Sequence, residues 1–368
     1  MPFRIAPRKT SSKPRRCTSA MAALAMAVVA IMPTAARAAP PDQTPIKLFI
    51  AFPMHHDNVE DIFDQTNPAH AWPNVLRNTA VISFSDGYIL RPHAPVATIV
   101  AFLKQHNIKM SLAINVVLQG KDTSPPTYAT TASGQQTPCG HHVPASGTPS
   151  DAGVAIDKIH QAGGRVDFVT LDEPLYFGHE YTHNQARGDQ SYGCQWSIPQ
   201  VAGMVKAAVQ SINRVNTNAN IRYAEWEPMG NRLISADQKF ADIQAWEPAL
   251  TQVLGQKITY MFSDANLLGT GRDSLQDTQS LMLRLKPWLA QYGNIELIAN
   301  CIGDKQTPDS AAWGEEAIQN CRRAEQLGLK SRSIALWANW IQRMPEQLVP
   351  ETLPGSYTND MLRYLTGN

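Results

Sequence analysis

Short runs of apolar residues alternate along the chain with segments in which apolar residues recur every three or four positions. Buried parallel strands produce the first pattern, because both of their faces are covered, and amphipathic helices produce the second. Eight segments rich in Val, Ile, Phe and Tyr are expected to be strands: 46–52, 80–86, 109–117, 166–172, 221–227, 258–264, 295–301 and 333–339. The clearest helical patterns cover 95–106, 199–215, 236–254, 273–292 and 312–327.

Four glycines mark where helical runs should end. Gly163, Gly255, Gly293 and Gly328 each follow such a run, and glycine readily adopts the left-handed conformation that closes many helices. Pro199 stands at the start of a run, where its fixed φ angle suits the first helical turn. These signals bound the helices between the expected strands.

Eight strand–helix alternations in one chain predict an α/β fold, a (β/α)8 TIM barrel. An open, doubly wound sheet would need fewer strands and usually carries a glycine-rich loop after the first one. The segment after the first expected strand contains no such loop. We therefore expect residues 39–368 to form a single barrel domain. Two long loops, 118–150 and 175–197, follow strands three and four, on the face where barrels place their catalytic residues.

The first 38 residues have the features of a secretory signal peptide. A basic start without acidic residues precedes an apolar stretch, 21–32, and Ala36 and Ala38 then form a small-x-small cleavage site. The apolar stretch is shorter than the roughly 20 residues that cross a membrane. We expect residues 1–38 to be removed from a secreted or periplasmic bacterial protein.

Removal of this segment changes the charge of the chain. It contains seven of the 32 Lys and Arg residues and none of the 31 Asp and Glu residues, so the net charge falls from +1 to −6. A mildly acidic chain without a basic stripe disfavours nucleic acid and anionic membranes as partners. No second long apolar segment follows, so membrane insertion after cleavage is not expected.

Four cysteines remain after residue 38: Cys139, Cys194, Cys301 and Cys321. An even number in an exported chain suggests disulfides, and four cysteines allow three pairings. Cys139–Cys194 with Cys301–Cys321 is favoured, because each pair would tie loops on one side of the barrel. Free buried thiols are the alternative, and no cysteine spacing suggests a structural zinc site.

Polar side chains stand at or after the ends of nearly all the expected strands. Five of the eight strands deliver an Asp or Glu there, which is more than helix capping alone explains. These residues should meet at one end of the barrel. The candidate catalytic residues are Glu173, Glu227 and Asp264, and the candidate substrate-binding residues are His55, Asp57, Asp86, Asn115, Asp172, Glu225, Trp226, Trp337 and Asn339.

Cleavage of a glycosidic bond requires acidic side chains that meet in this way. One carboxylic acid protonates the leaving oxygen, and a second carboxylate acts as base or nucleophile. Crowding of carboxylates raises the pKa of one of them and keeps it usable as an acid. Tryptophan rings near the strand ends can stack on sugar faces. This chemistry needs no cofactor, and its partner would be a carbohydrate.

The segment that ends in Leu171, Asp172, Glu173 and Pro174 resembles the fourth strand of the (β/α)8 glycoside hydrolases. In many of them the acid is a Glu at the end of strand four, often before a Pro, and a Trp stands near the end of strand eight, as Trp337 does. The resemblance implies that Glu173 is the general acid. The nucleophile that the commonest clan carries at the end of strand seven has no counterpart here, because Glu296 lies near the start of that strand. Glu227 and Asp264 therefore both stay open as the second carboxylate.

A competing motif lies in the loop after the fourth strand. His179, Glu180 and His183 read H-E-x-x-H, which on a helix places two zinc ligands on one face with the Glu as general base. Pro174 and Gly178 disfavour a helix here. A metal-dependent hydrolase using His179 and His183 is one alternative to a glycoside hydrolase, and a non-catalytic carbohydrate-binding barrel is the other.

Overall fold

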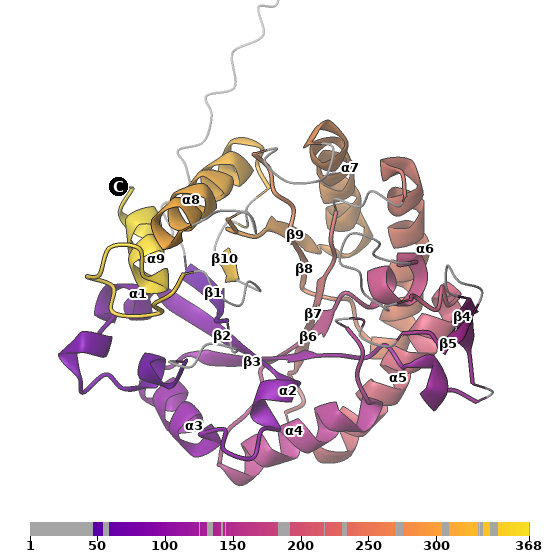
Figure 1. The fold of residues 1–368 in the computed structure, drawn as a ribbon, viewed down its shortest axis with the longest axis horizontal. Helices are drawn as coiled ribbons and strands as arrows, with labels where there is room; N and C mark the ends of the chain where they lie inside the picture. The colour runs from indigo at the N-terminus through magenta and orange to yellow at the C-terminus, as the bar shows by residue number, and fades with distance from the viewer. Residues whose placement is uncertain are drawn as a thin grey trace, which may run out of the picture. The chain divides into compact units, whose positions relative to one another are not determined.

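Eight parallel strands form one sheet in the order β10-β1-β2-β3-β6-β7-β8-β9 (Figure 1). Their bounds agree with the eight expected strands to within three residues at each end. They are β1 (Lys47–Ala51), β2 (Thr79–Ser85), β3 (Lys109–Ile114), β6 (Phe168–Asp172), β7 (Arg222–Trp226), β8 (Tyr260–Ser263), β9 (Glu296–Ala299) and β10 (Ile334–Ala338).

The sheet closes into a barrel between β9 and β10. A parallel bridge joins Asn300 to Leu336, and the backbone N–H of Cys301 donates to the Leu336 carbonyl at 3.0 Å. The Asn300 side chain completes this seam: its Oδ1 accepts from the Ala338 N–H at 2.9 Å, and its Nδ2 donates to the Ala338 carbonyl at 3.0 Å. The expected TIM barrel is confirmed.

This computed structural model describes residues 47–367 without 54–58, 125, 131–134, 141–142, 144, 183–191, 217, 230–233, 269–274, 304–308, 330, 332–333 and 339–344. All described residues belong to one unit, Gln43–Asn368. The signal peptide predicted for 1–38 and the candidate residues His55, Asp57, His183 and Asn339 lie outside them. None of the described helices is long and apolar enough to cross a membrane.

Helices surround the sheet, and at least one follows each strand (Figure 1). Of the five predicted helices, α6 (Ala236–Leu254) has the expected bounds, and α3 (Val96–Gln105), α5 (Ile198–Val215), α7 (Leu275–Gly293) and α8 (Ser310–Gln326) match within two residues at each end. The remaining helices, whose bounds the sequence pattern did not define, are α1 (Pro73–Asn78), α2 (Asp86–Ile89), α4 (Pro149–Gln161) and α9 (Tyr357–Thr366).

The shorter elements lie in the connections. Three 3-10 turns are η1 (Val59–Phe63), η2 (Pro68–His70) and η3 (Gly120–Asp122). The loop after β3 also contains a small antiparallel hairpin of β4 (Tyr128–Thr130) and β5 (Gln136–Pro138). The loop after β6 contains η4 (Tyr176–Glu180), a turn of π-helix. The two long loops therefore carry local structure of their own.

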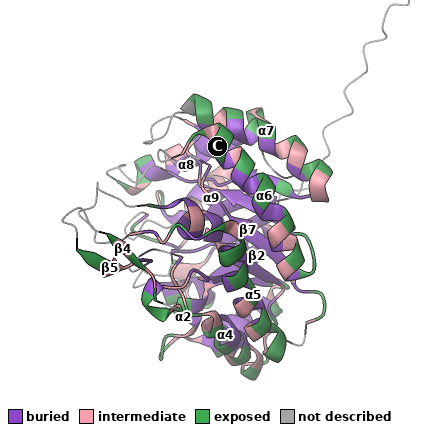
Figure 2. Ribbon diagram, turned by 90° about the vertical axis from the view of Figure 1, so that its right-hand side faces the viewer, coloured by how far each residue is buried: buried purple, intermediate pink, exposed green. Residues whose placement is uncertain are grey.

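Successive residues of each strand point alternately into the barrel and toward the helices. Phe49 of β1 packs against Phe168 of β6 and Phe262 of β8, with ring centroids 5.9 and 4.9 Å apart. These strands are not neighbours, so the three rings meet inside the barrel. Trp226 and Leu336 belong to the same inner cluster. Figure 2 shows the barrel strands buried among helices that carry exposed residues on their outer side.

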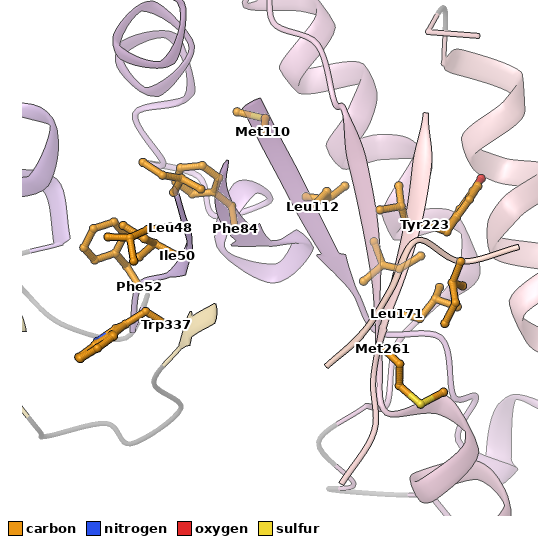
Figure 3. Close-up of a cluster of buried hydrophobic side chains, with 14 of the residues drawn as sticks. Leu48, Ile50, Phe52, Phe84, Met110, Leu112, Leu171, Tyr223, Met261 and Trp337 are labelled. Atoms are coloured by element: carbon orange, nitrogen blue, oxygen red, sulfur yellow. The ribbon is translucent and has the colours of Figure 1, made fainter. Parts of the chain in front are cut away.

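A larger apolar cluster fills the layer between the sheet and the helices. It contains the strand residues of the opposite parity, including Leu48, Leu171, Tyr223 and Trp337, several of which are drawn in Figure 3. Both faces of each strand are thus buried, which explains the nearly continuous apolar runs in the sequence.

Three of the four predicted glycine caps are confirmed. Gly163, Gly255 and Gly328 have φ angles of 76°, 70° and 67°. Gly293 was the wrong choice at the end of α7, since the left-handed position there belongs to Asn294, with φ 56°. Asparagine is among the residues that tolerate this conformation.

Both favoured disulfides are present. Cys139–Cys194 joins the loop after β3 to the loop after β6, with Cα atoms 5.0 Å apart, and the Gly140 N–H donates to the Tyr192 carbonyl at 2.6 Å beside it. Cys301–Cys321 connects the end of β9 to α8 instead of joining two loops. Each bond therefore fixes a segment that leaves the carboxyl end of the barrel.

Replacing Cys139 and Cys194 together by Ser should lower the free energy of unfolding by as much as about 4 kcal/mol, the loop-closure value for a separation of 55 residues. Denaturant unfolding of the oxidised proteins measures the difference. The double variant C301S/C321S is the matched comparison, and its shorter separation of 20 residues should give the smaller loss. The reverse order would contradict loop closure as the source of the stability.

Candidate active site

On two strands, the inward-facing row of residues continues into an acidic residue at the carboxyl end of the barrel. Asp172 follows Phe168 and Thr170 on β6, and Asp264 follows Tyr260 and Phe262 on β8 by the same alternation. Both aspartates are half-buried. They are also close enough in space for the charge of Asp264 to raise the pKa of Asp172. The structure therefore brings these two candidates together above the inner apolar cluster.

Asp264 is held by the residue that closes the barrel. The Nδ2 of Asn300 donates to Asp264 Oδ1 at 2.8 Å. Asn300 is itself fixed by the two bonds to Ala338 and by Asn320 of α8, whose Nδ2 donates to the Asn300 carbonyl at 2.9 Å. The orientation of Asp264 is thus set by the Asn300 side chain, which other hydrogen bonds hold at the seam of the barrel.

Glu173 breaks the alternation of the strand. The alternation would turn a residue after Asp172 toward the helices, but Glu173 adopts a left-handed backbone with φ 49°. Glu173 is half-buried as a residue, and its carboxyl group interacts with Asp172 and Asp264, and also with Glu227 and Lys239. Such a backbone is costly for a residue with a side chain, and these conformations cluster at functional sites.

Burial and neighbouring carboxylates raise the pKa values of this group. The pKa of Glu173 lies well above its ordinary value because of burial first, and then because of Asp172 and Asp264. Burial and the charges of Asp264 and Asp86 raise the pKa of Asp172 to about 7. Groups of this kind hold a proton near neutral pH and can serve as general acids.

Asp86 and Asn115 lie beside the site and are hydrogen-bonded to each other. Burial raises the pKa of Asp86 to about 6. Its Oδ1 accepts from the Gly87 N–H at 2.6 Å, and its Oδ2 accepts from the Asn115 N–H at 3.3 Å. Asp86 therefore connects the start of α2 to the end of β3, and its effect on Asp172 is electrostatic.

Glu225 does not reach this end of the barrel, which corrects its assignment to substrate binding. It shares the outward parity of Tyr223 and is fully buried between β7 and α6. Trp246 Nε1 donates to its Oε1 at 2.6 Å. Burial and the neighbouring Glu247 raise the pKa of Glu225 well above its usual value.

Glu227 lies on the same outward side and is fully buried. Its Oε1 accepts from Lys239 Nζ of α6 at 2.6 Å. The same ammonium group donates to both carboxylate oxygens of Glu180, at 3.0 and 2.8 Å. Burial raises the pKa of Glu227 to about 8, against the lowering effect of Lys239.

The two tryptophans predicted as sugar platforms are also corrected. Trp226 is 1% exposed inside the barrel, where its ring lies 5.1 Å from that of Phe262. Trp337 is fully buried on the helix side, near the rings of Tyr357 and Tyr364 (Figure 3 shows Trp337 beside Phe52). Neither ring presents a face on which a sugar could stack.

The H-E-x-x-H motif lacks the helix that zinc binding requires. The π turn ends at Glu180, and Tyr181 is extended. Glu180 is paired with Lys239, and His179 Nδ1 lies 2.6 Å from the Trp196 carbonyl. Among the described residues no three His, Cys, Asp or Glu side chains are grouped as a metal site.

The sequence pattern did not point to Lys239 or Tyr176. It also did not identify Asn300 as the hydrogen-bond donor to Asp264. A signal for Lys239 exists, because it occupies the buried stripe of α6 together with Ile243, Trp246 and Leu250. A charged residue on the apolar face of a helix needs a buried partner. Tyr176 stands three residues after Glu173 in the π turn, and Glu173 contributes to its raised pKa after burial.

The chain matches no protein-family model and no curated protein. Similar solved structures include an endo-β-1,4-mannanase from Cellulomonas fimi, with 13% identity over 87% of this chain and 70% of that one and a TM-score of 0.46. A chitinase from Pseudoalteromonas aurantia has 8% identity over 86% and 99% of the two chains, with a TM-score of 0.44. A fructose-bisphosphate aldolase from Plasmodium falciparum has 12% identity over 88% and 89%, also with 0.44. These proteins carry out different reactions, so the likeness does not indicate an activity.

The buried acid Glu247 should make the protein less stable as the pH rises. Burial and the charge of Glu227 raise its pKa to about 8, whereas an unfolded chain releases this proton near the ordinary value of 4.5. Between these values the folded state holds more protons, so the free energy of unfolding falls with rising pH. The effect amounts to several kcal/mol, since one pKa unit corresponds to about 1.4 kcal/mol.

Glu247→Gln should flatten this dependence, because the amide is neutral at every pH. Denaturant unfolding at intervals from pH 4 to 9 compares the two proteins. Glu296→Gln, at an exposed position, is the control and should follow the wild type. Equal slopes for E247Q and wild type would show that Glu247 is already ionised when buried.

Proposed function

We propose that this chain is a glycoside hydrolase that uses Glu173 as general acid and Asp264 as second carboxylate. The observation that carries the proposal is the meeting of Asp172, Glu173 and Asp264 at the carboxyl end of one barrel, with raised pKa values for the first two. Glycosidic cleavage needs one protonated and one ionised carboxyl group on either side of the bond.

In this mechanism the protonated Glu173 donates its proton to the glycosidic oxygen as the bond to the anomeric carbon breaks. Asp264, oriented by Asn300, either removes a proton from an attacking water or attacks the anomeric carbon itself. Asp172 interacts with both groups and raises the pKa of Glu173. The proton therefore stays on Glu173 until the leaving oxygen takes it.

Asp264 suits the second role better than Glu227. Asp264 is half-buried on the inward face, where a substrate at the carboxyl end of the barrel can reach it. Glu227 is fully buried on the helix side and bonded to Lys239. A base or nucleophile must come within hydrogen-bonding distance of its target, which favours Asp264.

We further propose that the enzyme is exported and meets its carbohydrate outside the cytoplasm. The signal-like sequence of residues 1–38 supports export. The two disulfides support it as well, because such bonds persist in oxidising compartments.

Glu173→Gln and Asp264→Asn should each reduce the hydrolysis of a responsive glycan by at least about a thousandfold, because each removes a reacting group while keeping its shape. A panel of soluble oligo- and polysaccharides, assayed for new reducing ends, supplies the substrate. Glu296→Gln should retain full activity, since this exposed residue lies at the amino end of β9, whereas the candidate site lies at the carboxyl ends of the strands.

Wild-type turnover in either E173Q or D264N would refute the assignment of that residue. If wild-type protein binds glycans in the panel but cleaves none, the chain is a carbohydrate-binding barrel instead. Loss of hydrolysis after treatment with a chelator, restored by metal, would favour the metal-dependent alternative.

A further inference from the structure

A buried network of charged side chains lies next to Glu173, the proposed acid. Lys239, Glu180 and Glu227 are at most 5% exposed. Lys239 Nζ lies 2.8 Å from Glu180 Oε2 and 2.6 Å from Glu227 Oε1. Burial alone would lower the pKa of Lys239, but the two carboxylates raise it, so the ammonium group stays charged. Charges are seldom buried this completely unless their partners are well placed.

The network joins three separate segments of the chain around Glu173. Glu180 ends the π turn that begins three residues after Glu173. Glu227 directly follows β7, and Lys239 lies in the first turns of α6. The Tyr176 N–H also faces Glu227 and lowers the pKa of its carboxyl group. Glu180 attaches the end of the π turn to the network, and the Phe177 N–H ties the turn back to the Glu173 carbonyl at 3.0 Å. Glu173 therefore lies between β6 and a turn that the network holds in place.

The network also acts on Glu173 electrostatically. Glu227 raises the pKa of Glu173, and Lys239 lowers it. The other titratable groups that face Glu173 are Asp172 on β6, Asp264 after β8 and Tyr176 in the π turn. Lys239 additionally faces the Tyr176 ring, with its Nζ 5.7 Å from the centroid, and Glu225 on β7.

We propose that Glu180, Glu227 and Lys239 are positioning residues that hold Glu173 in its left-handed backbone, and that Glu227 and Lys239 also act on its carboxyl group through their charges. This assignment rests on the proposed function, in which Glu173 is the acid. It gives Glu227 a role other than that of base or nucleophile. It also assigns the buried Lys239 a role in addition to its packing in α6.

Glu227 and Lys239 carry charges of opposite sign, so the replacement of each in turn tests the proposal. Glu227→Gln removes a negative neighbour and should lower the pKa of Glu173 by about one unit. Lys239→Met removes the positive neighbour and should raise it. A merely structural role would loosen the π turn in both variants and would not produce shifts in opposite directions.

The titration of Glu173 can be followed without any substrate. Protein labelled with ¹³C at the glutamate carboxyl carbons is titrated by NMR, and the resonance of Glu173 is identified by its loss in Glu173→Gln. Glu296→Gln is the control, and it should leave that titration unchanged. If Lys239→Met does not fold, the comparison of Glu227→Gln with Glu296→Gln decides the proposal alone, since Gln keeps the shape of Glu.

Activity provides the second measurement. On a glycan that the wild type hydrolyses, Glu227→Gln should keep activity within about tenfold at its own optimum, with the alkaline limb of kcat/KM displaced to lower pH. An unchanged Glu173 titration in Glu227→Gln would overturn the proposal, and so would a thousandfold loss of activity at every pH. Absence of any glycan hydrolysis by the wild type would refute the proposed function, while the NMR titration would still decide the network.

Discussion

The closure of the barrel between β9 and β10 is the constraint on which the rest of the structure depends. Elsewhere the strands are joined by backbone ladders, but at this seam the Asn300 side chain supplies two of the bonds to Ala338. Closure of a parallel sheet arranges all of its carboxyl ends in one ring. The third bond of Asn300 reaches Asp264, so the residue that completes the ring also orients a proposed catalytic group.

Strand parity then separates the acidic residues into two sets. Asp172 and Asp264 continue the inward rows and stand at the rim, whereas Glu225 and Glu227 continue outward rows and lie under α6. Glu173 would belong to the outward set, but its left-handed backbone places it between the two. Its carboxyl group therefore interacts with charges from both sets, which adds to the effect of burial in raising its pKa.

Much of the fold could be predicted because its signals are local. Apolar runs, helical periodicity and glycine caps gave the strands and five helices, and strand ends pointed to Glu173 and Asp264. The errors at Glu225 and Trp337 share one cause. When both faces of a strand are buried, the sequence does not distinguish the face inside the barrel from the face under the helices. Lys239 was missed because its partners come from distant segments, which a helical pattern does not reveal.

The left-handed backbone of Glu173 has an evolutionary consequence. Gly or Asn would occupy φ 49° at less cost than Glu, and a smaller uncharged residue would also relieve the crowding of carboxylates. Thermodynamic stability and acid chemistry thus make opposite demands on this position. A descendant of this chain without the proposed activity could exchange this glutamate for Gly or Asn and gain stability.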